Sequence, residues 1–116
     1  MYTYNWAKLA NGLYCPLRTL DLTNVMSTLG VYVIWHSGLK PHAVRVGQGI
    51  IGTRLGEHRA DPEILACEVL GQLVASWINP PAAHLDGLEN YLGNLLQPIV
   101  GSRFPIAEPI AVNLPL

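Results

Sequence analysis

The chain has 116 residues, of which half are apolar and 13% are charged, and its formal net charge is −1. This length suits one domain with one core, and the apolar content excludes an intrinsically disordered chain. Proteins that hold nucleic acid are usually basic, so the charge argues against that class, although a few clustered arginines can make a local positive site.

The start of the chain predicts a cytoplasmic protein. No apolar run is long enough to span a bilayer, and "MYTYNWAKLA" lacks the basic region and apolar stretch of a signal peptide. Cys15 and Cys67 are isolated, without C-x-x-C spacing. We therefore expect both cysteines to be reduced and buried.

After a mixed segment with a short helix expected near residues 20–29, two strands are predicted. "GVYVIWH" begins at Gly30 and "AVRVGQ" begins at Ala43, and the sequence between them is typical of a hairpin loop centred on residues 37–40. A loop centred there places Tyr32 opposite Arg45. Residues directly opposite each other share a face, so both side chains should point the same way.

Two short helices and a third strand follow. Ile51 and Leu55 are four residues apart, as are Arg54 and His58, which predicts an amphipathic helix despite the glycines within it. "DPE" at residues 61–63 predicts the start of a second helix that ends near residue 70. "LVASWI" at residues 73–78 predicts the third strand.

A last helix is expected to begin with Asn79 as its cap, to carry Pro80 and Pro81 in its first turn and to end near Leu96. Glu89 falls at the margin of the apolar stripe of this helix, so its carboxylate must find a cation, a donor or water. The stripe consists of Leu85, Leu88, Leu92, Leu95 and Leu96, with Tyr91 at its other margin.

The prolines after residue 98 exclude a further helix, and the apolar tail over residues 103–116 should lie extended against the body or a second copy. The element order predicts a single α+β domain over residues 1–116. Its core over about residues 30–98 should hold a small three-stranded sheet that contains an antiparallel hairpin and is flanked by helices. An N-terminal lead-in and a C-terminal extended tail complete the predicted domain.

The order of these features resembles the GIY-YIG nuclease superfamily, which is named after two tripeptides on adjacent strands. The matching features are Gly30-Val31-Tyr32, Arg45-Val46-Gly47, "TRLGEH" and Glu89 in a late helix that ends near Pro98. The resemblance covers about residues 30–98. It implies a three-stranded sheet flanked by helices and hydrolysis of phosphodiester bonds in nucleic acid, expected to be DNA, with one Mg²⁺ or Mn²⁺ ion.

Carried over to this sequence, the resemblance implies a role for each matching residue. Glu89 would be the metal ligand, and Tyr32 would contact the attacking water. Arg54 would hold the scissile phosphate, and His58, one turn later, would assist proton transfer or orientation. These roles suit the residue types. Hard cations such as Mg²⁺ prefer carboxylate oxygen, which Glu89 offers, and the guanidinium of Arg54 can bind a phosphate.

The chain departs from the family pattern at two places. The tyrosine of the second tripeptide is Arg45, which can bind a phosphate oxygen or lower the pKa of Tyr32 but cannot act as a base. The asparagine that many members carry after the last helix is Gly101, and Asn113 is a candidate replacement.

Each residue also has a structural interpretation. Tyr32 could be a packed aromatic, Arg45 an exposed strand residue, and Glu89 the partner of Arg59 or Arg103. The alternative function is therefore a catalytically degenerate module of the same fold that binds nucleic acid or a protein partner. An ion pair between Arg45 and Glu89 would favour this alternative. The oligomeric state stays open, with a homodimer among the choices.

Overall fold

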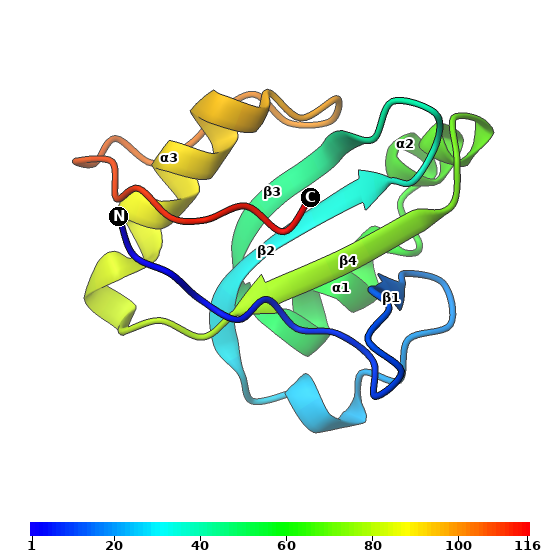
Figure 1. Ribbon diagram of the computed structural model, residues 1–116, viewed down its shortest axis with the longest axis horizontal. Coiled ribbons are helices and arrows are strands. Elements are labelled where there is room, and N and C mark those ends of the chain that lie inside the picture. Colours follow the sequence, from blue (N-terminus) through cyan, green and yellow to red (C-terminus); the bar gives the residue numbers. More distant parts are fainter.

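The computed structural model describes residues 1–116 and contains one four-stranded antiparallel sheet (Figure 1). The strand order is β1-β4-β2-β3, so β2 is central and β3 is an edge strand. The strands are β1 (Cys15–Pro16), β2 (Leu29–His36), β3 (His42–Ile50) and β4 (Leu73–Ile78). The α+β class is confirmed, whereas the two-residue β1, which pairs with β4, was not expected.

Three α-helices flank this sheet: α1 (Ile51–His58), α2 (Pro62–Leu65) and α3 (Leu85–Leu96). Single 3₁₀ turns lie at Thr23–Val25 (η1), Ala66–Val69 (η2) and Ala82–His84 (η3). The helix start predicted at "DPE" is confirmed, because the Asp61 side chain accepts a hydrogen bond of 2.9 Å from the Glu63 backbone N–H.

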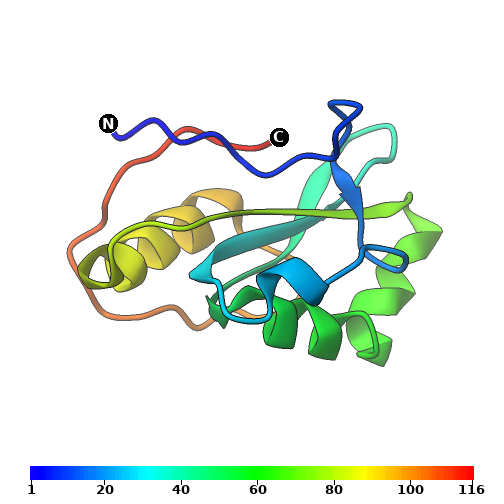
Figure 2. The same cartoon turned by 90° about the horizontal axis from the view of Figure 1, so that it is seen from below.

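The two faces of the sheet carry separate cores. α1 and α2 cover one face, where Tyr32 and Ile34 of β2 pack against Ile51 and Leu55. α3 and the two terminal segments lie on the other side, and the first and last parts of the chain run next to each other there (Figure 2). Alternate residues of β2 therefore serve different cores, as strand geometry requires.

The predicted hairpin is present, but its register differs from the expected one. β2 and β3 are adjacent and antiparallel, with Tyr32 opposite Gly47 and Ile34 opposite Arg45. Direct pairing of Tyr32 with Arg45 was therefore wrong, because the loop is longer than four residues and Val44 forms a β-bulge beside Ile34 and Trp35. Tyr32 and Arg45 still share the α1 face. Arg45 stands opposite Ile34, and Ile34 lies two residues after Tyr32 on β2, so all three side chains point the same way.

The last helix begins later than the sequence predicted. Asn79 does not cap it, and its side chain donates a hydrogen bond to the Leu29 carbonyl instead. α3 begins at Leu85, because residues before a proline avoid helical backbone angles and Pro81 itself is extended. The predicted end at Leu96 is confirmed, but Leu95 is exposed rather than part of the buried stripe.

The tail packs against the body, as expected. Val112 forms a parallel bridge with Tyr2 and is buried, and the Ile110 N–H donates to the Gly87 carbonyl at 3.0 Å. Asn113 exchanges hydrogen bonds with the backbone of Tyr4. Both cysteines are free and buried. No helix has the length and apolarity that crossing a bilayer would need.

Candidate active site

A tyrosine and a histidine form a buried pair on the α1 face. The Tyr32 hydroxyl, from β2, lies 2.5 Å from Nε2 of His58, the last residue of α1. Burial, followed by the charges of Arg45 and Arg54, lowers the pKa of His58 from 6.5 to about 4. The imidazole is therefore neutral at neutral pH, and its Nε2 can accept the hydrogen bond that Tyr32 donates.

Burial also governs the tyrosine. It raises the pKa of Tyr32, and the charge and hydrogen-bonding side chain of Arg54, followed by the charge of Arg45, oppose that shift without reversing it. Gly47 lies directly across the hairpin, and a Cβ at this position would be 2.3 Å from the Tyr32 hydroxyl oxygen. A glycine is thus required in the second tripeptide because the tyrosine ring of the first rests on its backbone.

Arg54 projects from α1 over another glycine. Gly49 has a φ of 135°, and a Cβ there would lie 3.1 Å from the Arg54 Cγ. The guanidinium meets Glu57 on its exposed side, with 3.7 Å between Nη1 and Oε1. The Arg54 Nε is buried and has no hydrogen-bond partner.

Arg45 projects from β3 and rests on a third glycine. Gly101 has a φ of 87°, and a Cβ there would lie 2.5 Å from the Arg45 Nη1. Hydrogen bonds from the Ile99 and Val100 N–H groups to the Ala43 and Val44 carbonyls hold this segment along β3. The Arg45 Nε is also buried without a partner, and Arg45 takes part in no ion pair.

Glu89 is buried, with 9% of its surface exposed, and no cationic side chain lies within 4.0 Å of its carboxylate. Burial raises its pKa, as does the charge of Asp86, one turn earlier on α3, while the side chain of Gln48 opposes the shift. Neither arginine considered from the sequence is its partner, and Arg59 donates to the Leu20 carbonyl instead. The ion pair between Arg45 and Glu89 that would have favoured a degenerate module is absent.

These five residues, Tyr32, Arg45, Arg54, His58 and Glu89, are here called the polar cluster. The charges of Arg45 and Arg54 each influence the pKa of Tyr32, His58 and Glu89, and the hydrogen bond between Tyr32 and His58 is the direct contact within the cluster. Asn113 lies with the N-terminal segment on the α3 side and does not join the cluster, so it does not replace the missing asparagine.

Sequence reasoning missed Gln48. Its side chain leaves β3 toward α3, where Nε2 donates a hydrogen bond of 2.7 Å to the Asp86 carboxylate, and it also approaches Glu89. The alternation of side chains along a strand could have indicated its direction. Gly47 faces the α1 side, so the next residue, Gln48, must face the side on which α3 packs.

The donors near Glu89 fit a hard divalent cation. The buried carboxylate of Glu89 and the exposed carboxylate of Asp86 supply oxygen ligands three residues apart on α3, and the buried one lacks a protein cation. Mg²⁺ and Mn²⁺ accept few protein carboxylates and keep several waters. No set of three histidine, cysteine, aspartate or glutamate side chains converges anywhere in the chain.

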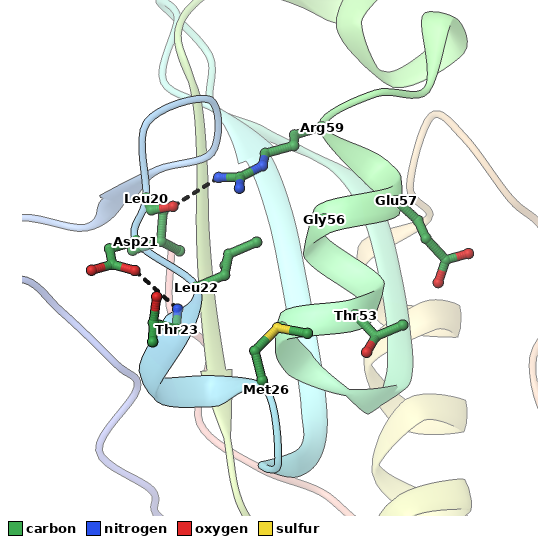
Figure 3. A pocket seen from close by; sticks show the side chains of 10 residues that line it. Leu20, Asp21, Leu22, Thr23, Met26, Thr53, Gly56, Glu57 and Arg59 are labelled. Atoms are coloured by element: carbon green, nitrogen blue, oxygen red, sulfur yellow. Dashed lines mark hydrogen bonds between the residues drawn. The ribbon is translucent and has the colours of Figure 1, made fainter.

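The largest surface groove lies elsewhere. It has a volume of about 570 Å³ and runs between the segment around η1 and the side of α1 that carries Thr53 and Glu57 (Figure 3). None of the five cluster residues lines it. A smaller groove of about 290 Å³, between the end of α3 and the segment after it, reaches Gly101, on which Arg45 rests.

Comparison with protein-family models, curated proteins and solved structures finds no match for this chain. The resemblance to the GIY-YIG superfamily therefore stays a prediction that rests on the residues named above.

Proposed function

We propose that the chain is a metal-dependent phosphodiesterase that cleaves nucleic acid, with DNA as the expected substrate. The observation that carries the proposal is the composition of the polar cluster. A tyrosine bonded to a neutral histidine, two guanidinium groups with unpartnered nitrogens and a buried carboxylate without a cation lie within electrostatic reach of one another. Such a set supplies a proton acceptor, anion binding and a metal ligand.

Glu89, with Asp86 beside it, would hold the ion, which when bound would polarise the phosphate and offset charge on the leaving oxygen. Gln48 would keep the Asp86 carboxylate in place through its hydrogen bond. Since a hydrogen-bonded ligand loses less freedom on binding, this contact favours the ion.

The proton of the attacking water goes to the Tyr32–His58 pair. Tyr32 alone is a poor base, because burial raises its pKa and keeps it as the neutral phenol at neutral pH. His58 is neutral at neutral pH and lies 2.5 Å from the hydroxyl, so Tyr32 can take a proton from water while its own proton moves to Nε2. Because the pKa of His58 is about 4, Nε2 is a weak base that would hold this proton only until the leaving oxygen accepts it. Arg54 stabilises the negative charge that develops on the phosphate oxygens.

One observation favours the second candidate, a module that binds nucleic acid or a protein partner without cutting. The Tyr32 side chain has no exposed surface, so water reaches its hydroxyl only after a neighbouring side chain moves. A binding module needs no such access. Either function goes with a cytoplasmic location, where free cysteines such as Cys15 and Cys67 persist.

The decisive experiment compares cleavage by the wild type, Glu89→Gln and Glu108→Gln. Glu108 is exposed in the tail, so its variant makes the same chemical change away from the cluster. Duplex, flapped, branched and single-stranded DNA and RNA are incubated with Mg²⁺, Mn²⁺ or EDTA. We expect metal-dependent cleavage that Glu89→Gln lowers about a thousandfold and Glu108→Gln leaves unchanged.

Equal cleavage by the wild type and Glu89→Gln would identify a contaminating nuclease and reject the proposal. Binding of nucleic acid without cleavage under any metal condition would establish the binding module instead. If the wild type neither cleaves nor binds at low salt, a protein partner becomes the remaining choice.

A further inference from the structure

Two arginine side chains are buried in part without the acceptors that a guanidinium requires. The Nε atoms of Arg45 and Arg54 are both inaccessible and both unpartnered. Arg54 meets a carboxylate only at 3.7 Å on its exposed side, and Arg45 meets none. Removing such donors from water without replacing the lost hydrogen bonds is unfavourable, and the Nε atom of each side chain is left without the acceptor that it requires.

The same two arginines gather like charge at one place. Arg45 and Gly49 are four residues apart on β3 and so share a face of that strand, and the Arg54 side chain lies over Gly49. Glu89 is not within 4.0 Å of either group and does not neutralise them. Like charges that share a partly buried site are favourable only when an anion joins them.

Both side chains are also seated by glycines. Arg54 lies over Gly49 and Arg45 lies over Gly101, and both glycines have positive φ angles that other residues rarely adopt. The segment that carries Gly101 is tied to β3 by two backbone hydrogen bonds. The guanidinium of Arg45 is therefore positioned before any ligand arrives, which lowers the cost of binding.

We propose that Arg45 is a second phosphate-binding residue, and that with Arg54 it forms a site for a nucleic-acid phosphate that works without a divalent cation. The identity of the polymer rests on the proposed function. Of the two roles that the sequence left to Arg45, lowering the pKa of Tyr32 is outweighed by burial, which raises that pKa, and phosphate binding suits a guanidinium that has no carboxylate partner. Two local arginines also allow a chain of net charge −1 to hold an anion.

The test measures binding in EDTA, where no cleavage occurs. A fluorescein-labelled single-stranded DNA is titrated by anisotropy with the wild type, Arg45→Gln, Arg54→Gln and Lys40→Gln. Lys40 is exposed in the hairpin loop, so its variant loses the same charge outside the cluster. Arg45→Gln and Arg54→Gln should each weaken binding about tenfold near 50 mM salt, and Lys40→Gln less than about twofold.

Two further measurements separate a contact from a change in net charge. The slope of log affinity against log salt should fall by about 0.7 in Arg45→Gln, the value for one lost phosphate contact on a single strand. Gly101→Ala keeps the charge but puts a Cβ 2.5 Å from the Arg45 Nη1, so it should weaken binding as well. Circular dichroism establishes that each variant is folded.

The outcomes distinguish this inference from the proposed function. If Arg45→Gln binds like Lys40→Gln, or if the wild type does not bind in EDTA, the inference is wrong even when the wild type cleaves DNA with Mg²⁺. If binding depends on Arg45 but no metal supports cleavage, the phosphate site stands and the proposed phosphodiesterase is rejected.

Discussion

His58 should make the stability of the fold depend on pH, and a single substitution should remove that dependence. Its pKa is about 4 in the folded protein against 6.5 for an ordinary histidine. A histidine whose pKa is depressed by folding binds more protons in the unfolded chain. Its contribution to the free energy of unfolding is therefore complete above pH 6.5 and is lost as the pH falls toward 4.

The magnitude follows from the two pKa values. Near pH 5 the unfolded histidine is almost fully charged and the folded one is largely neutral, so protonation favours the unfolded chain by about 2 kcal/mol relative to pH 7.5. Glu89 acts in the opposite direction, because its raised pKa lets the folded protein bind a proton first. The effect of His58 is therefore obtained as a difference between variants.

The assay is urea unfolding followed by tryptophan fluorescence, near pH 7.5 and near pH 5, for the wild type, His58→Gln and His42→Gln. His42 is exposed at the start of β3 and serves as the control. The wild type and His42→Gln should lose about 2 kcal/mol more than His58→Gln on acidification. If all three proteins lose the same amount, His58 is not held neutral by the fold, and its assigned part in proton transfer fails.

Three other expectations concern the cluster and the tail. Glu89→Gln should raise the midpoint of thermal unfolding, because burial disfavours the charged carboxylate, and an unchanged or lower midpoint in calorimetry would contradict this. Gly47→Ala should destabilise the fold by about 1–3 kcal/mol in urea titrations, since its Cβ would overlap Tyr32, whereas a neutral effect would mean that the ring moves freely. Removal of residues 103–116 should lower the stability of the fold and speed its proteolysis, because it uncovers Trp6 and the apolar face of α3. If the shortened protein resists protease as well as the wild type does, the tail has no packing role.

Much of the fold was predictable because its signals are local. The limits of β4 follow from a run of apolar and β-branched residues, and α2 begins where Asp61 and Pro62 provide a cap and a first turn. The late start of α3 also had a local signal, which is the pair of consecutive prolines. Residues before a proline avoid helical backbone angles, and this restriction outweighs the tendency of Asn79 to cap a helix. The bulge at Val44 carries no local signal, so the register of Arg45 could not be predicted.

For the candidate site, the sequence could predict which residues take part but not which of them contact one another. Spacing placed Arg54 and His58 one turn apart, and periodicity placed Glu89 at the edge of a buried stripe. The bond between Tyr32 and His58 joins residues 26 positions apart and depends on how closely α1 approaches β2. The support of Arg45 by Gly101 depends on the path of the chain after α3, which periodicity does not determine.

The pairing of the first residues with the last ones has a consequence for synthesis. The Trp6 indole donates to the Asn113 carbonyl at 2.9 Å, and the Tyr2 backbone bonds to Ala111 and Asn113. Residues 1–6 are synthesised more than a hundred residues before these partners. The segment that carries Trp6 therefore cannot dock until residues 111–113 have left the ribosome, and its docking should appear as a late change in tryptophan fluorescence.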